Sequence, residues 1–76
     1  MRETVEMIVK ALVDDTDAVD VREVEHTSAT LIEVRVSEAD MGKLIGRQGR
    51  TVRALRSIML AASIKKGRRF TLEIVE

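Results

Sequence analysis

The apolar residues of this chain switch between helical and strand spacing, and that pattern limits the fold more than any other feature of the sequence. Near the start they recur at intervals of three and four residues, which is typical of one buried face of an amphipathic helix. The members of this first group are Val5, Ile8, Val9, Leu12 and Val13. The acidic stretch 14–17 contains no apolar residue, so the helix is expected to end there.

Two strands are predicted next, over residues 18–26 and 30–36, because apolar and polar residues alternate there. The connection at 27–28 is short and predicts an antiparallel hairpin rather than a crossover. The alternation of the first strand slips between Val21 and Val24, which predicts a bulge or an early end to that strand.

A short second helix is predicted from Ser37 to about Ile45. Ser37 is followed three residues later by Asp40, the spacing in which a serine hydroxyl caps the first backbone amides of a helix. Gly42 lies inside this helix, where glycine costs about 1 kcal/mol relative to alanine. That cost indicates close approach by another backbone or by a ligand.

A third helix is predicted after Gly49, and a third strand follows it. One arc of the helix carries Val52, Leu55, Ile58, Met59 and Ala62, and its last turn holds Lys65 and Lys66 before Gly67. The final strand alternates through Phe70, Leu72 and Ile74. The predicted order is therefore α-β-β-α-α-β, an α+β chain.

Size and composition indicate one small module. A domain of this length buries only about 60% of its unfolded surface. The chain has no cysteine, so neither a disulfide nor a thiolate zinc site is expected, and a cytoplasmic location is the natural expectation. No apolar run approaches the roughly 20 residues that span a bilayer, so no membrane association is expected.

The formal net charge is zero, but the two halves of the chain are oppositely charged. Residues 1–40 hold four basic against eleven acidic residues, a net −7, and residues 41–76 hold nine against two, a net +7. A basic face of this kind attracts polyanions. A solvated mixed surface explains the same residues equally well.

The stretch LIGRQGRTV at 44–52 places two glycines and several basic residues between the second and third helices. Glycine commonly ends a helix with a positive φ, so one of the two needs no functional explanation. Helix starts expose unpaired amides, and glycine lets a phosphate approach without meeting a Cβ atom. Because Arg47 and Arg50 add positive charge there, a phosphate-contacting turn is favoured over a purely structural one.

These residues resemble the KH-domain signature, in which an apolar residue and GxxG are followed by a second apolar residue. IGRQGRTV at 45–52 matches it, and the element order resembles the type II, prokaryotic form. The whole chain is similar to the small single-domain bacterial KhpA family, through KALVD, MGKLIGRQGR, RALRSIMLAA and LEIVE. The resemblance implies one type II KH domain over residues 1–76, with a three-stranded mixed sheet packed against three helices and a GxxG loop at 46–49.

In that family the loop clamps the backbone of about four nucleotides of single-stranded RNA. Transferred position by position, the resemblance implies RNA contacts by Gly42, Lys43, Gly46, Arg47, Gln48, Gly49, Arg50 and Arg53. Members often have lysine where this chain has Arg47, a departure that keeps the cation. Arg56 extends the charged ridge or is merely solvated. Ile45 and Val52 are expected to anchor the loop to the core.

Other functional classes find little support in the sequence. Phe70 is the only aromatic residue and is expected in the core, which disfavours base stacking on exposed rings. His26, the only histidine, is expected to be an exposed strand end. Asp14, Asp15, Asp17 and Asp20 lack the glycine and glutamate of an EF-hand and indicate a solvated acidic turn. No catalytic residue, metal, cofactor or small-molecule substrate is expected, so the chain is predicted not to be an enzyme.

A second class of function is protein assembly. The third helix has more apolar breadth than one small sheet requires, through Met59, Leu60 and Ile64. These residues either complete the monomer's core or form a dimer interface. The resemblance implies self-association and pairing with a larger KH protein of the KhpB (Jag) type, linked to RNA regulation and to cell elongation and division. A scaffold with incidental RNA binding is therefore the alternative to an RNA regulator or RNA chaperone.

Overall fold

The computed structural model describes residues 1–75, which form helices and strands in the predicted order. The helices are α1 (Arg2–Leu12), α2 (Met41–Ile45) and α3 (Arg50–Lys66). The strands are β1 (Asp20–Glu25), β2 (Ala29–Arg35) and β3 (Arg69–Ile74). Short 3-10 turns at Thr16–Ala18, Glu38–Asp40 and Arg47–Gly49 precede β1, α2 and α3.

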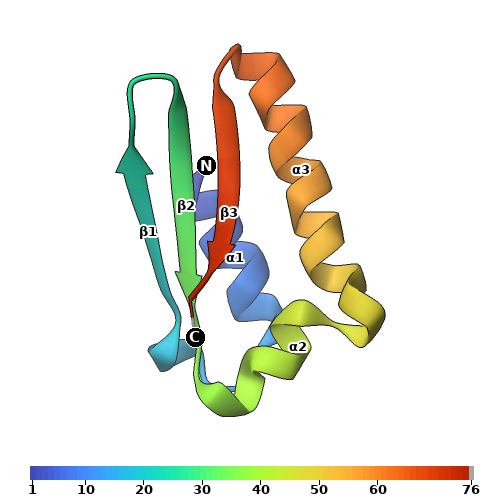
Figure 1. Cartoon of the computed structure of the whole chain (residues 1–76). Coiled ribbons are helices and arrows are strands. Elements are labelled where there is room, and N and C mark those ends of the chain that lie inside the picture. Colours follow the sequence, from blue (N-terminus) through green and yellow to red (C-terminus); the bar gives the residue numbers. More distant parts are fainter. Residues whose placement is uncertain (76) are drawn as a thin grey trace.

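The strands form one mixed sheet with β2 in the centre (Figure 1). β1 and β2 are antiparallel, with partners running from Asp20↔Arg35 to Glu25↔Thr30. β2 and β3 are parallel, because the chain crosses over through α2 and α3 before it returns to the sheet. The predicted α+β fold, with a three-stranded mixed sheet and three helices, is confirmed.

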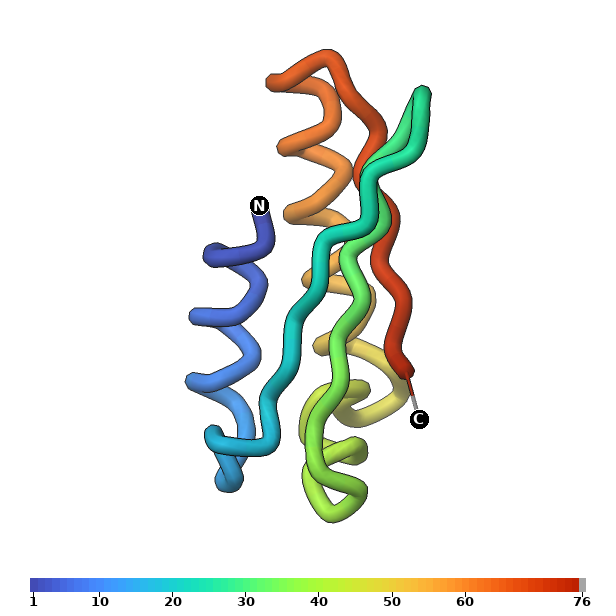
Figure 2. Tube along the Cα trace, turned by 90° about the vertical axis from the view of Figure 1, so that its left-hand side faces the viewer, coloured from blue at the N-terminus to red at the C-terminus, as the bar shows by residue number. Residues whose placement is uncertain are grey.

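The two long helices cover one face of the sheet and leave the other face open. Figure 2 shows α1 and α3 on the same side of the three strands. α2 lies beyond the end of β2, at the foot of the sheet in Figure 1. No helix within residues 1–75 combines the length and the apolar character needed to cross a bilayer.

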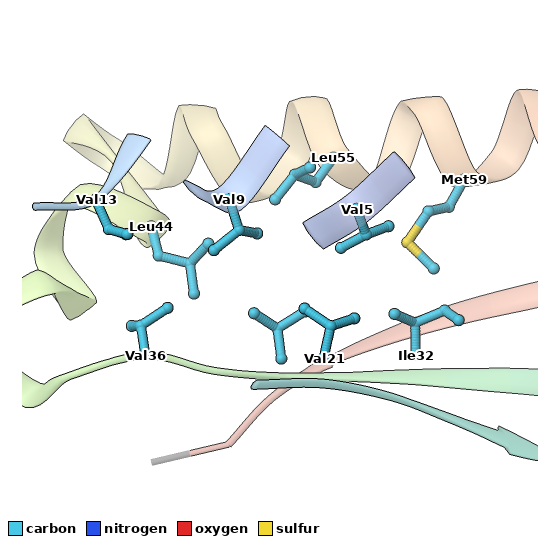
Figure 3. Close-up of a cluster of buried hydrophobic side chains, with 10 residues drawn as sticks. Val5, Val9, Val13, Val21, Ile32, Val36, Leu44, Leu55 and Met59 are labelled. Atoms are coloured by element: carbon cyan, nitrogen blue, oxygen red, sulfur yellow. The ribbon is translucent and has the colours of Figure 1, made fainter. Parts of the chain in front are cut away.

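The hydrophobic core fills the space between α1, α3 and the sheet (Figure 3). Side chains that are at most 2% exposed come from every layer: Val5, Val9, Ile32, Val34, Leu44, Leu55 and Met59. Each such burial stabilises the fold by about 1.5–3 kcal/mol. Phe70, Leu72 and Ile74 are half-buried and pack against the core, because β3 is an edge strand.

The α3–β3 connection is held to the β-hairpin by Arg68. Its Nε donates to Thr30 Oγ1 at 2.7 Å, and its Nη2 donates to the carbonyl oxygens of His26 at 2.8 Å and Ala29 at 3.2 Å. Gly67 ends α3 with a φ of 64°, as predicted for a left-handed cap. One of the nine basic residues of the second half is therefore a structural clamp.

Two local predictions are wrong. Within the described residues β1 has no bulge, because its register with β2 is continuous and Val24 pairs with Leu31. The alternation of apolar residues in β1 slips because Val24 sits on the open face of the sheet, 37% exposed. Ser37 caps no backbone amide; its hydroxyl donates to Oδ2 of Asp40 at 3.0 Å instead, and α2 begins only at Met41.

Candidate nucleic-acid interface

The GxxG loop joins α2 to α3 at the opposite end of the molecule from the β1–β2 turn (Figure 1). α2 ends at Gly46 (φ 79°, ψ 169°), whose amide donates to the carbonyl oxygen of Gly42 at 2.8 Å. Gln48 (φ 57°) and Gly49 (φ 73°) are both left-handed. The Gly49 amide donates to the carbonyl oxygen of Gly46 at 3.1 Å, so the loop is a tight, internally bonded turn.

The two loop glycines are required for different reasons. A Cβ atom at Gly46 would lie 2.2 Å from Thr51 Oγ1 and 2.8 Å from the Thr51 backbone nitrogen. The chain's own packing therefore requires glycine at this position. A Cβ atom at Gly49 would meet only Arg53 Nε, at 3.9 Å, so the Gly49 side of the loop is open to a ligand.

Gly42 also presents an open surface. Within residues 1–75, no atom beyond its chain neighbours and the backbone of α2 lies within 4 Å of the place where its Cβ would stand. Close approach by another backbone, one of the two explanations predicted for this glycine, is therefore not made by residues 1–75. Close approach by a ligand stays a prediction.

Three arginines beside the loop are exposed and unengaged. Within residues 1–75, none of Arg47, Arg50 and Arg56 forms an ion pair. Gln48 is exposed as well, and a shallow depression beside the loop is lined by Gln48, Arg50, Arg53, Ala54 and Ser57. The depression lies at the N-terminus of α3, where the helix dipole favours an anion.

Two of the cations predicted to contact RNA already have partners in the chain. The Arg53 side chain donates to the carbonyl oxygens of Gln48 and Gly49. Lys43 forms an ion pair with Asp14, with 48% of the lysine side chain exposed. Hydrogen bonding to Asp14 raises the pKa of Lys43, so the lysine remains charged but is shared with a carboxylate.

Asp40 links the start of α2 to the segment that follows α1. Its burial was not predicted from the sequence. It is 3% exposed, and its carboxylate accepts hydrogen bonds from the amides of Asp15 at 3.0 Å and Asp14 at 3.3 Å. The Asp15 amide is the main cause that holds the pKa of Asp40 below its usual value, against the opposing effect of burial. The sequence places this acid three residues after Ser37, but that spacing was interpreted as a helix cap.

An apolar groove lies between α3 and β3. Its lining comes from both elements: Arg56, Met59, Leu60, Ser63, Arg69, Phe70, Thr71 and Leu72. Ser63 joins the two walls, because its hydroxyl donates to the Met59 carbonyl oxygen at 2.8 Å and accepts from the Phe70 amide at 2.9 Å. Sequence reasoning missed this groove because it exists only where α3 packs beside the edge strand.

The exposed face of α3 connects the loop to this groove. Arg50, Arg53, Ser57, Leu60 and Ile64 recur at intervals of three and four residues and therefore form one stripe along the helix. The stripe is cationic at the loop end and apolar towards the other end. An extended chain bound at the loop can thus follow α3 over its length of about 25 Å.

One predicted role near the loop is wrong, and burial decides between the two alternatives predicted for Met59. Val52 is buried, but Ile45 is 40% exposed, and the fully buried Leu44 anchors α2 instead. A helix of five residues turns only one side to the core. Met59 is 1% exposed and belongs to the core, which removes it from the predicted dimer interface, whereas Leu60 and Ile64 are 63% and 77% exposed.

Within residues 1–75, no cluster of histidine, cysteine, aspartate or glutamate side chains could hold a metal ion. His26 is exposed beside the hairpin turn, as predicted. Asp14 and Asp15 are exposed, and their backbone amides bond to Asp40.

Comparison with known proteins places the chain in one family. The family model described as KhpA/KhpB, KH domain, matches residues 2–74. The RNA-binding protein KhpA of Aquifex aeolicus is 47% identical over 76 residues, covering 100% of this chain and 96% of the relative. The proteins of the same name from Borreliella burgdorferi and Caldanaerobacter subterraneus are 46% and 45% identical, covering 97% and 99% of this chain and 90% and 100% of the relatives. No solved structure gives a significant match. With this agreement over nearly its whole length, the chain belongs to the KhpA/KhpB family of KH domains.

Proposed function

We propose that this chain binds single-stranded RNA by clamping the sugar-phosphate backbone on its GxxG loop. One observation carries the proposal: the open side of Gly49 lies at the start of α3 beside two exposed arginines, Arg47 and Arg50, that form no ion pair within residues 1–75. A phosphate placed there meets the positive end of the helix dipole and two cations. The relatives are named RNA-binding proteins, which supports the same conclusion.

The groove between α3 and β3 accepts bases in this proposal. Its lining surface is mostly apolar, and its one aromatic ring, Phe70, is half-buried. With few free polar groups to read base edges, selectivity for sequence is weak. With few phosphate contacts, affinity is modest, and each neutralised phosphate contributes roughly −0.7 to the slope of log K against log salt.

The test is the double variant Arg47→Asp/Gln48→Asp, measured by fluorescence anisotropy with a short labelled single-stranded RNA. Both side chains are exposed, so the fold is expected to survive. Arg22→Asp/Thr27→Asp is the matched control, because it changes the net charge equally at exposed positions of β1 and the hairpin turn, across the sheet from α3 (Figure 1). The loop variant should lose binding and the control should keep it. Equal affinities for folded wild-type and loop-variant protein would refute the mechanism.

We propose that the 76 residues act as one KH domain in the cytoplasm, as a post-transcriptional regulator or RNA chaperone that works with a KH protein of the KhpB (Jag) type. The charge separation supports this role, because the basic α3 side attracts RNA while the acidic residues of the other half repel phosphate. Membership of a family of RNA-binding KH domains, rather than of enzymes, confirms that the chain is not an enzyme.

A second candidate function, protein assembly, is favoured by the exposure of Leu60 and Ile64. Two large aliphatic side chains one turn apart on α3, 63% and 77% exposed, suit a homodimer or heterodimer contact. Sedimentation of wild-type protein beside Leu60→Glu tests it, since a wild-type monomer would remove the homodimer. Two RNA-binding loops in one dimer would also gain affinity through effective concentration.

The two functions place different demands on the loop. If the protein is chiefly an RNA binder, Arg47→Asp/Gln48→Asp abolishes RNA retention in cells together with the cellular phenotype. If it is chiefly a scaffold in the control of elongation and division, the same variant leaves partner pairing and phenotype intact. Crosslinking and sequencing of bound RNA, with wild-type and loop-variant cells in parallel, separates the two.

A further inference from the structure

We propose that Arg53 is a positioning residue, which holds the GxxG loop in its binding shape and acts on RNA through the loop rather than through a phosphate. The inference rests on the proposed RNA-binding function. Its guanidinium reaches back over the loop from the first turn of α3: Nη2 donates to the carbonyl oxygen of Gln48 at 2.5 Å, and Nε donates to that of Gly49 at 3.3 Å.

The loop residues that Arg53 contacts have left-handed backbone conformations, which require stabilisation by their surroundings. Within residues 1–75, Gln48 is the only non-glycine residue with a positive φ, at 57°. A residue with a Cβ atom is strained in this conformation and keeps it only where its surroundings impose it. Gly49 is left-handed as well, and within residues 1–75 Arg53 Nε is the only heavy atom beyond its chain neighbours that lies within 4 Å of the place its Cβ would occupy.

The loop is therefore held from its two sides by two residues of α3. Thr51 packs against Gly46 so closely that no Cβ fits there, and this contact fixes the conformation of the first half of the loop. Arg53 donates hydrogen bonds to the carbonyl oxygens of Gln48 and Gly49, and these bonds fix the conformation of the second half of the loop. With both in place, the loop meets RNA already ordered, and binding avoids the entropy cost of ordering it.

The geometry requires the planar fork of arginine. Two donors at fixed spacing bond two successive carbonyl oxygens, whereas the single ammonium of lysine is a point charge on a flexible stem. A phosphate contact has the opposite preference, because lysine serves a phosphate as a point charge almost as well. Arg53→Lys thus separates the two roles. Arg35, exposed on β2 and without an ion pair within residues 1–75, is the matched control for charge.

Nitrogen-15 relaxation of the free protein measures the loop directly, since order parameters are about 0.85 in rigid backbone and below about 0.6 in flexible backbone. Arg53→Ala and Arg53→Lys are both expected to lower the order parameters of Gln48 and Gly49, with the thermal midpoint nearly unchanged. Arg35→Ala and Arg35→Lys should leave them at the wild-type values. Binding of a short labelled single-stranded RNA should weaken roughly tenfold for Arg53→Lys, the size expected from reordering one freed residue. Arg35→Lys should bind as the wild type does.

Two results would overturn the proposal. If Arg53→Lys keeps wild-type order and wild-type affinity, Arg53 acts as a simple charge. If either Arg53 variant loses affinity while the loop order stays unchanged, Arg53 contacts RNA directly. A wild-type protein that binds no single-stranded RNA would refute the proposed function instead, and the order parameters of the free protein would still decide whether Arg53 holds the loop.

Discussion

Replacing Gly46 with alanine should destabilise the domain far more than replacing Gly49, although both belong to the same motif. Gly46 has φ 79° and ψ 169°, a region that is essentially restricted to glycine and costs other residues about 1–3 kcal/mol. The new Cβ atom would also lie 2.2 Å from Thr51 Oγ1 and 2.8 Å from the Thr51 backbone nitrogen. Overpacking of this kind adds about 1–3 kcal/mol. The loss is then comparable with the whole stability of a domain of this size, about 4–11 kcal/mol.

Gly49 and Gly42 give matched comparisons. Gly49→Ala places a left-handed alanine in open space, at a cost of about 1–2 kcal/mol. Gly42→Ala should have the opposite effect on stability. The residue lies in α2 without a positive φ, and within residues 1–75 no atom outside α2 lies within 4 Å of the added Cβ. Alanine there should stabilise the protein by about 0.5–1 kcal/mol.

Urea unfolding followed by circular dichroism measures all three variants on one scale. The expected order of stability is Gly42→Ala, wild type, Gly49→Ala, Gly46→Ala. Adding Thr51→Ala to Gly46→Ala should restore only part of the loss, because the Thr51 backbone nitrogen stays at 2.8 Å. A Gly46→Ala protein as stable as Gly49→Ala would refute the reasoning from loop geometry.

Three further predictions follow from contacts outside the glycines. Asp40→Asn should lower the urea midpoint at pH 7 relative to Glu38→Gln, because the Asp40 carboxylate is buried and accepts three hydrogen bonds whereas Glu38 is exposed. Folding lowers the pKa of Asp40, so the stabilisation from its ionised carboxylate is fully present above the pKa of the unfolded chain, about 3.9. This stabilisation is lost as the pH falls through the lower pKa of the folded protein. The urea midpoints of the two variants should therefore converge in strong acid. Arg68→Ala should cost about 2–3 kcal/mol in urea unfolding through its lost bonds to the hairpin, whereas the exposed Lys66→Ala should stay within about 0.5 kcal/mol; equal stabilities would contradict the clamp. Asp14→Asn frees Lys43 and should raise RNA affinity while steepening the salt slope by roughly 0.7, with Asp17→Asn as control; an unchanged slope would mean that Lys43 does not reach a phosphate.

Local patterns were enough to predict the elements and their order. The spacing of Val5, Val9 and Val13 places them together on the buried face of α1, and Gly67 ends α3 as predicted. The short turn after β1 makes a hairpin, as loop length requires. These predictions succeeded because they depend on neighbours within a few residues along the chain.

The predictions that failed depended on partners distant in sequence. Ser37 and Asp40 match a helix cap, but the amides of Asp14 and Asp15, on the other side of the hairpin in sequence, occupy the carboxylate. Met59 and Leu60 are adjacent and equally apolar, yet only Met59 faces the core. Which neighbour is buried depends on how α3 lies against β3.

The sequence by itself determined the kind of protein: the order of elements, the GxxG motif and the family to which they belong. Only the tertiary structure decided which residues of the site are open to a ligand and which make contacts within the chain. Gly46 serves internal packing while Gly49 faces open space, and Arg47 and Arg50 have no ion pairs within residues 1–75 while Lys43 and Arg53 bond to the chain itself. The physical reason is that charge and flexibility belong to a residue type, whereas a free donor or an open surface depends on what the fold brings next to it.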